Sequence, residues 1–336
     1  METRRRIARE ARPARLDEPA GAAEPARFRR PPRLLPGDRV AVVAPAGPTD
    51  RESLEAGLRI LGSRYAVEWE PGLLSRTRYL AGDDARRGAE LGRALGDPGI
   101  AAVVAARGGY GCLRLLPALW PVDAAGRPAP PAAPKLLVGF SDLTALHAAQ
   151  QATGVVSVHG PVVTQLGGQP RPVVERLFAL LEDARAAPPP LLGTPVVGGI
   201  AEGPLLGGNL SVLTRLLGTP WLPDLAGAIL LVEDVGERPY RVDRMWTHLR
   251  LAGVFARIAG LALGEFTDCE ERDGDYVLQD LLGELAAATG LPCVAGLPVG
   301  HGAVNVPLPL GCRVRIDGGT GALVVLEPAV AARPPR

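Results

Sequence analysis

The sequence is poor in lysine, cysteine and aromatic residues, and these shortages exclude several kinds of site. Lys135 is its single lysine, so a Walker-type phosphate loop, which ends in Gly-Lys-Ser/Thr, is absent. The four cysteines are widely spaced and form no C-x-x-C pair, which disfavours a zinc ribbon and a thioredoxin-like redox motif. The H-E-x-x-H motif of zinc peptidases is missing as well. We therefore expect no metal and no cofactor.

Charge and hydropathy exclude further classes. The formal net charge is +1, from 37 basic and 36 acidic side chains, which gives no general attraction to nucleic acid or to an anionic membrane. Prolines and glycines interrupt the long uncharged stretches, and no basic segment leads into an apolar signal core. Since 47% of the residues are hydrophobic and 22% charged, the chain has the composition of a folded globular protein. We expect a cytoplasmic protein with neither a nucleic-acid nor a membrane partner.

The length of 336 residues fits two domains of ordinary size. The start of the chain is rich in arginine and lacks apolar periodicity, and a stretch rich in proline and glycine lies near the middle. The sequence therefore predicts a disordered extension over 1–32, a first domain over 33–168, a linker over 169–200, a second domain over 201–328 and a tail over 329–336.

The first domain alternates short apolar runs with helical stretches. The run at 39–47 resembles a buried parallel strand, and further apolar runs at 100–111 and 136–140 lead into polar turns. Helical stretches lie around 50–63 and 83–95. This alternation predicts a mostly parallel sheet with helices on both faces, which places ligands beyond the carboxyl ends of its strands.

The second domain has more β-like sequence. A glycine-rich turn is predicted at 203–210, a strand within 227–237 and a helix within 240–255. Short apolar runs follow at 291–302 and 312–327. Together they predict a compact α/β domain with more β-structure than the first, so the fold class is α/β throughout.

Ser141 is the most informative polar residue of the first domain. An apolar strand delivers it into a turn, and a helix begins at once, which is the geometry of a nucleophile elbow. The segment G-F-S-D-L lacks the second glycine of the usual G-x-S-x-G elbow, which disfavours an ordinary α/β-hydrolase. Serine is also a common N-cap of helices, so this segment alone leaves both interpretations open.

A second candidate element is the G-G-Y-G segment at 108–111, again after an apolar strand. Consecutive glycines let the backbone approach a ligand, and their N–H groups can point at a developing oxyanion. The glycine spacing does not spell G-x-G-x-x-G, which argues against a dinucleotide site. Taken alone, the segment favours a tight turn between strand and helix over a binding role.

A serine hydrolase also needs a base and a carboxylate that orients it. Of the four histidines, His159 and His301 lie in glycine-bounded turns after apolar runs, and the spacing does not choose between them. Glu233 follows an apolar run and lies at a predicted strand end, with Asp234 on the opposite face if the strand continues. The Glu-Asp pair is equally compatible with a turn or helix start.

Taken together, these segments resemble the LD-carboxypeptidase family, the muramoyltetrapeptide carboxypeptidases of bacterial cell-wall recycling. The resemblance runs from about residue 35 to about residue 326. It rests on seven segments in order, PGDRVAVVAPAG, ARGGYGCLRLLP, KLLVGFSDLTAL, VHGP, GPLLGGNLSVL, VEDVGERPYRVDRM and PVGHGAVNVPLPLG. The resemblance implies a flavodoxin-like first domain with a smaller second domain, and a homodimer.

The resemblance also implies the catalytic residues. It assigns the nucleophile to Ser141, the carboxylate to Glu233 and the base to His301, and so decides between the two candidate histidines. The backbone N–H groups of Gly109 and Asp142 are the implied oxyanion hole.

Substrate contacts are implied for Gly108 and Asn209, and the implied substrate is a small peptide or muropeptide with a terminal D-alanine. One alternative is the related microcin C immunity peptidase, which acts on peptidyl or aminoacyl nucleotides. That branch is expected to stack the base on tryptophan, and the stretch from 154 to 199 has none. A second alternative is a non-catalytic α/β ligand-binding protein, in which Ser141, Glu233 and His301 would be unrelated in space.

Overall fold

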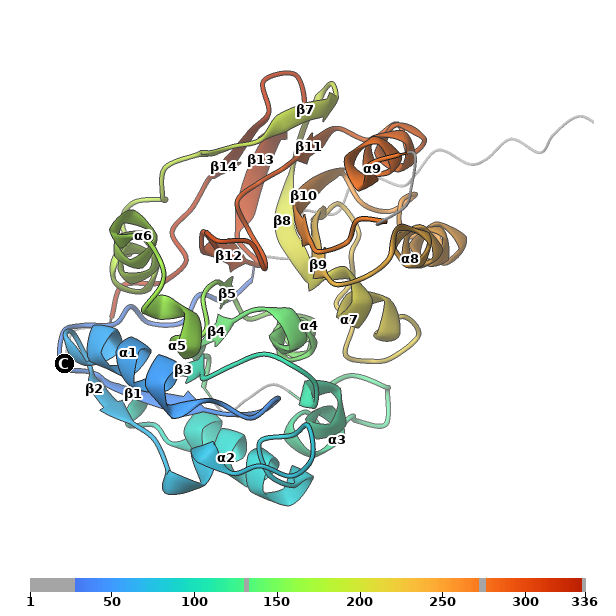
Figure 1. Cartoon of the computed structure of the whole chain (residues 1–336). Coiled ribbons are helices and arrows are strands. Elements are labelled where there is room, and N and C mark those ends of the chain that lie inside the picture. Colours follow the sequence, from blue (N-terminus) through green and yellow to red (C-terminus); the bar gives the residue numbers. More distant parts are fainter. Residues whose placement is uncertain (1–27, 130–132, 272–275, 334–336) are drawn as a thin grey trace, which may run out of the picture.

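The computed structural model describes residues 28–129, 133–271 and 276–333. They form two sheets with helices packed around them, one from each half of the chain (Figure 1). The predicted α/β class is confirmed, with a mostly parallel first sheet and a mixed second sheet. The prediction of disorder for 1–27 lies outside the described residues.

The first sheet has the strand order β12-β5-β4-β3-β1-β2. Strands β1 to β5 pair in parallel and β12 adds an antiparallel edge. The order 2-1-3-4-5 within it is that of flavodoxin-like folds. Its strands are Arg39–Val43 (β1), Ala66–Glu68 (β2), Ile100–Ala105 (β3), Leu136–Gly139 (β4), Ser157–His159 (β5) and Leu308–Leu310 (β12).

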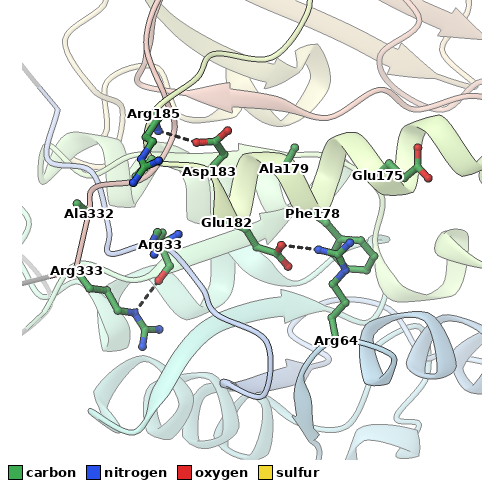
Figure 2. A pocket seen from close by; sticks show the side chains of 11 residues that line it. Arg33, Arg64, Glu175, Phe178, Ala179, Glu182, Asp183, Arg185, Ala332 and Arg333 are labelled. Carbon is green, nitrogen blue, oxygen red and sulfur yellow. Dashed lines mark hydrogen bonds and ion pairs between the residues drawn. The ribbon is translucent and has the colours of Figure 1, made fainter. Parts of the chain in front are cut away.

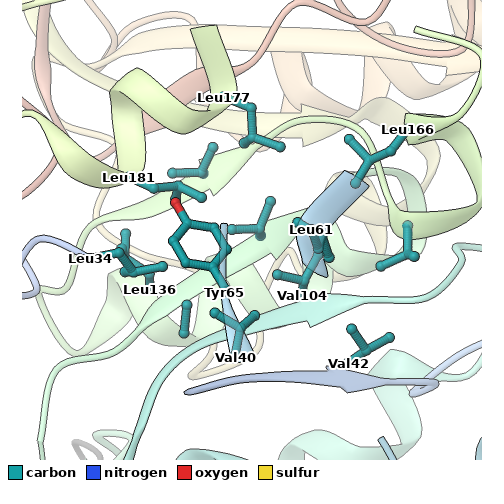
Figure 3. Close-up of a cluster of buried hydrophobic side chains, with 14 of the residues drawn as sticks. Leu34, Val40, Val42, Leu61, Tyr65, Val104, Leu136, Leu166, Leu177 and Leu181 are labelled. Carbon is teal, nitrogen blue, oxygen red and sulfur yellow. The ribbon is translucent and has the colours of Figure 1, made fainter. Parts of the chain in front are cut away.

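Helices cover both faces of this sheet, as the alternating pattern predicts. On one face α1, α5 and α6 bury a core that includes Leu61, Leu166 and Leu181 (Figure 3), and α2, α3 and α4 cover the other face. The helices are Arg51–Gly62 (α1), Asp84–Gly96 (α2), Leu116–Leu119 (α3), Thr144–Ala152 (α4), Val163–Leu166 (α5) and Arg171–Glu182 (α6), with 3₁₀ turns at Pro71–Leu74 (η1), Cys112–Leu115 (η2) and Ser141–Leu143 (η3).

The second sheet has the order β6-β14-β13-β8-β9-β10-β11-β7. Its two edge strands, β6 and β7, are joined by Gly193 alone, which brings the edges together and makes the sheet barrel-like. The strands are Leu191–Leu192 (β6), Thr194–Val197 (β7), Ile200–Asn209 (β8), Ile229–Val235 (β9), Gly260–Thr267 (β10), Cys293–Ala295 (β11), Arg313–Asp317 (β13) and Ala322–Val325 (β14); the helices are Leu210–Arg215 (α7), Pro239–Leu251 (α8) and Leu278–Ala287 (α9).

The glycine-rich segment predicted as a turn at 203–210 is instead most of strand β8, so that prediction is wrong. Its glycines allow close backbone packing within the sheet. A Cβ on Gly203 would lie 2.0 Å from the Gly227 carbonyl oxygen, and one on Gly207 would lie 2.1 Å from that of Leu231. Glycine here marks crowding inside a strand rather than a chain reversal.

The predicted linker over 169–200 contains helix α6 and strands β6 and β7. Residues such as Leu177 and Leu181 of α6 are buried in the first core. Glu182 at its end accepts a hydrogen bond from Arg64 at 2.5 Å (Figure 2). It also accepts from the Tyr65 hydroxyl at 2.6 Å. The segment therefore extends the first domain before it crosses to the second sheet.

The ends of the described chain are also packed rather than free. Phe28 packs on the core, Arg29 forms a parallel bridge with Val155, and Pro32 bridges Ala331 from the predicted tail. The predicted extension and tail are thus ordered over 28–32 and 329–333. Among the described residues, none of the helices is long and apolar enough to cross a membrane.

Strand β12 belongs by sequence to the second half but pairs with β5 of the first sheet. The chain segment just before it carries the G-H-G turn at 300–302. This crossing anchors the turn directly beside the carboxyl edge of the first sheet. It therefore brings residues of both halves to one place.

Candidate active site

Ser141 lies on a strained turn at the end of β4. Its φ angle is +64°, a left-handed conformation that non-glycine residues seldom adopt. Such backbone strain costs on the order of 1–3 kcal/mol and persists only where the surrounding structure holds it. The turn leads through η3 into α4, so the serine has the geometry of a nucleophile elbow. Ser141 is therefore not the ordinary N-cap that the sequence left open, because no side-chain cap bond is found at this helix start.

Glycines clear the space around this turn. A Cβ on Gly108 would lie 2.9 Å from the Ser141 Cβ and 3.1 Å from its Oγ. A Cβ on Gly139 would lie 2.8 Å from the Leu143 Cγ. The G-G-Y-G loop and the serine turn therefore contact each other through positions where any side chain would clash.

The three residues of the implied triad meet in the structure. His301 Nε2 lies 3.0 Å from Ser141 Oγ, and His301 Nδ1 lies 2.7 Å from Glu233 Oε2. Because an ionised carboxylate only accepts hydrogen bonds, Nδ1 carries the proton and Nε2 accepts from the serine hydroxyl. The result is a continuous hydroxyl–imidazole–carboxylate chain between the two domains.

Glu233 ends the apolar part of β9 and is fully buried. Glycine at two neighbouring positions lets the carboxylate reach the imidazole. A Cβ on Gly300 would lie 2.7 Å from Glu233 Oε2, and one on Gly264 would lie 3.0 Å from the Glu233 Cβ. Gly300 has φ +126°, and its N–H donates to Asn305 Oδ1 at 3.0 Å, which fixes the G-H-G turn.

Asp234 points to the other face of β9 and has a different task. Its carboxylate accepts from the Asn209 amide at 3.0 Å and from the Ser211 N–H at 2.8 Å. Burial raises the pKa of Asp234 to about 6. Of the Glu-Asp pair, only Glu233 contacts the imidazole.

The other candidate base, His159, is fully buried in β5 and neither ring nitrogen has a partner among the described residues. Burial lowers its pKa to about 3, so the ring is neutral. It packs edge-on against Phe140 with ring centroids 5.7 Å apart, and Phe140 in turn contacts the His301 ring at 4.6 Å. His159 thus supports the site through packing.

The predicted oxyanion residues lie on the same loops. Gly109 is exposed with φ +120°, and the Gly47 N–H donates to the Gly108 carbonyl at 3.0 Å, which holds the loop in place. The Asp142 side chain is buried and accepts from the Cys112 N–H at 2.8 Å. The sequence predicted a role only for the backbone of Asp142. This hydrogen bond, which joins the serine turn to the segment after the G-G-Y-G loop, was not predicted.

Asn209 is 4% exposed and lies beside Glu233 in the sheet register. Its side-chain oxygen caps α7 by accepting from Val212 N–H at 3.1 Å, and its amide nitrogen donates to Asp234. The backbone N–H donates to the Thr144 hydroxyl at 2.9 Å, next to the serine turn. Both side-chain polar atoms are thus engaged inside the protein.

Other features of the molecule lie apart from these residues. A cavity of about 670 Å³ is lined by residues of α6, by Arg64 after α1 and by Arg33 and Arg333 near the two ends of the described chain (Figure 2). None of the triad residues lines it. Within the described ranges, no group of three or more His, Cys, Asp and Glu side chains could hold a metal ion.

Comparison with known proteins places the chain in a family. Two family models match, the LD-carboxypeptidase N-terminal domain over residues 40–160 and the LD-carboxypeptidase C-terminal domain over residues 202–316. The chain is 40% identical over 294 residues to the murein tetrapeptide carboxypeptidase of Pseudomonas aeruginosa, covering 83% of this chain and 93% of that one. It is 28% identical over 275 residues to the microcin C7 self-immunity protein MccF of Escherichia coli, covering 71% and 77%.

Among solved structures, muramoyltetrapeptide carboxypeptidase from Oxalobacter formigenes has a TM-score of 0.73 and 31% identity, with 86% of this chain and 99% of that chain covered. The resemblance inferred from the seven sequence segments is thereby confirmed. The chain belongs to the LD-carboxypeptidase family, the S66 family of peptidases.

Proposed function

We propose that this protein is a serine peptidase that removes the terminal D-alanine from murein tetrapeptides. The bond cleaved would join that D-alanine to an L-configured centre, that of meso-diaminopimelate. One observation supports the chemistry above all, the unbroken hydrogen-bonded chain from Ser141 Oγ through His301 to Glu233. The proposal of a murein peptide as the substrate rests on relatives such as the murein tetrapeptide carboxypeptidase of Pseudomonas aeruginosa.

In the first half of the reaction, Ser141 Oγ attacks the carbonyl carbon while His301 Nε2 takes the hydroxyl proton. Glu233 holds the imidazole in the correct tautomer and stabilises its protonated form. His301 then gives this proton to the amino group of D-alanine as the C–N bond breaks, which leaves an ester on Ser141.

In the second half, His301 removes a proton from water, which attacks the ester carbonyl. His301 then returns this proton to Ser141 Oγ as the ester bond breaks and the shortened peptide leaves. Acid–base catalysis of this kind contributes about 10²–10⁴-fold. The N–H groups of Gly109 and Asp142 are proposed to stabilise the oxyanion of both tetrahedral intermediates, at roughly 3 kcal/mol for each donor.

Gly108 and Asn209 are proposed to border the substrate. Gly108 leaves room beside the nucleophile, where a Cβ would lie 3.1 Å from Ser141 Oγ. Asn209 would act mainly by holding the rim of the site, since its side-chain atoms are already bonded to Val212 and Asp234. A homodimer stays a prediction, and light scattering of the purified protein tests it.

The function is tested by incubating purified protein with free tetrapeptide, with muropeptide and with an aminoacyl nucleotide. Release of D-alanine from the first two is expected, and Ser141→Ala should abolish it with little change in melting temperature. Hydrolysis of the nucleotide substrate alone would instead assign the protein to microcin-type immunity. Full turnover by the Ser141→Ala variant would refute the nucleophile.

A further inference from the structure

We propose that Arg107 binds the α-carboxylate of the residue that the enzyme removes, and so makes it specific for free C-termini. This inference rests on the proposed function. Arg107 lies two residues after the end of β3 and directly precedes Gly108, the glycine that borders Ser141. Its side chain is exposed, although the loop that carries it is tightly held.

The backbone around Arg107 is fixed from both sides. The Ala106 N–H donates to the Val43 carbonyl at 2.7 Å, and the Ala106 carbonyl accepts from the Thr164 N–H at 3.1 Å. On the other side, the Gly108 carbonyl accepts from the Gly47 N–H at 3.0 Å. The guanidinium therefore projects from a rigid support, as an orienting group should.

The length of the arginine side chain favours the same assignment. Arg107 is two residues from Gly109, so their Cα atoms lie at most about 7 Å apart. In a bound substrate the terminal carboxylate belongs to the residue after the scissile carbonyl. The Cα atoms of these two neighbouring residues are roughly 3.8 Å apart. An arginine side chain can span this separation.

The guanidinium also lies near the carboxyl ends of β1 and β3. Arg107 Nη1 donates to the Pro48 carbonyl at 2.7 Å, so the side chain lies across from the end of β3 to the loop after β1. In this sheet the strand order reverses between β1 and β3, and ligands of such folds bind at that point. One nitrogen is thus used for orientation, and the planar group has further N–H donors for a carboxylate.

The charges nearby are compatible with an anion. Asp50 caps α1, and its carboxylate accepts from the Ser53 N–H at 2.8 Å, which already engages part of its negative charge. The N-terminus of α1, a helix of 12 residues whose N-cap Asp50 lies two residues after Pro48, adds positive potential there. A carboxylate pairing with Arg107 would accept two charge-assisted hydrogen bonds, which an amide-capped C-terminus could not match.

The test compares hydrolysis of a tetrapeptide ending in D-alanine with that of the same peptide ending in D-alaninamide. The wild-type enzyme should prefer the free acid. Arg107→Ala should lower kcat/KM for the acid about 10- to 100-fold and leave the amide rate nearly unchanged, because only the acid loses charge-assisted hydrogen bonds. Arg107→Lys should recover part of the preference, since lysine keeps the charge but not the planar fork.

Arg59→Ala is the matched control, because it removes an exposed arginine from α1 away from the site. It should leave both rates unchanged. If Arg107→Ala keeps the wild-type ratio of acid to amide hydrolysis, the assignment of Arg107 is wrong while the proposed function stands. Failure of the folded wild-type enzyme to release D-alanine from any murein peptide would overturn the proposed function and the Arg107 assignment with it.

Discussion

The two domains place their catalytic groups at or next to left-handed backbone positions in different ways. In the first domain the left-handed position carries the reactive side chain itself, Ser141 at φ +64°. In the second domain the left-handed position is a glycine, Gly300 at φ +126°, and His301 follows it. The nucleophile is thus itself the strained non-glycine residue, whereas the turn that carries the base has glycine at its left-handed position, where this conformation has little steric cost.

The two acidic residues of β9 also differ in what they hold in place. Glu233 reaches the imidazole because Gly264 and Gly300 leave room for it, and its neighbour Asp234 supports the backbone instead. Two adjacent carboxylates on opposite faces of β9 therefore have separable tasks. Substitutions that remove one carboxylate and keep the other test whether Glu233 and Asp234 have separate roles.

The largest effect is expected from Glu233→Gln compared with Asp234→Asn. Loss of the carboxylate that holds the histidine tautomer should lower kcat about 10³- to 10⁴-fold. Asp234→Asn should leave kcat much closer to wild type and instead change the melting temperature, because Asn209 and the Ser211 N–H lose a charged partner. Steady-state kinetics and thermal melts of both variants measure this; equal losses of kcat would mean that the two carboxylates share one role.

A smaller effect should reveal the strain at Ser141. Both Ser141→Gly and Ser141→Ala remove the nucleophile, but only glycine adopts φ +64° without steric cost. The glycine variant should therefore be more stable than the alanine variant by about 1 kcal/mol. Denaturant unfolding of the two inactive variants tests this, and an alanine variant as stable as the glycine variant would show that the elbow is unstrained.

The smallest effect concerns pH, and here two buried histidines of the first domain and Asp234 of the second should act with opposite sign. In the first domain burial lowers the pKa of His159 to about 3 and that of His147 to about 4, so the unfolded chain binds more protons below the usual histidine range. Their contribution to stability should rise with pH from about 3 to about 6.5. In the second domain the pKa of Asp234 is raised to about 6, so the folded state binds the extra proton and its contribution should fall between about 4 and 6.

Urea unfolding across this range, for wild type, His159→Leu and Asp234→Asn, separates the two contributions. His159→Leu should reduce the rise in the free energy of unfolding with pH, and Asp234→Asn should make that rise steeper. Identical pH slopes in all three proteins would show that neither group titrates differently on folding.

The sequence predicted the first sheet well because its buried parallel strands are continuous apolar runs between helices. It predicted β8 as a turn, since glycine is ordinarily a turn residue and the crowding against Gly227 and Leu231 arises only once the sheet forms. Helix α6 was missed because prolines and glycines flank it on both sides. The crossing of β12 to the first sheet is a long-range pairing that no local pattern encodes.

For the site, the spacing of residues left His159 and His301 open, and the resemblance to a family chose between them. What distinguishes them physically is burial, since His159 has no access to a reacting group while His301 bridges Ser141 and Glu233. The bond between the Asp142 side chain and the Cys112 N–H could not be predicted, because the two residues lie 30 positions apart.

The central claim is that Ser141 and His301, from different domains, act as one unit. The most direct measurement is kcat/KM for D-alanine release by Ser141→Ala, by His301→Ala and by the double variant. If the residues form one proton-transfer chain, each single variant should lose nearly as much activity as the double variant. Losses that multiply in the double variant would contradict a shared relay and show that the two side chains contribute independently.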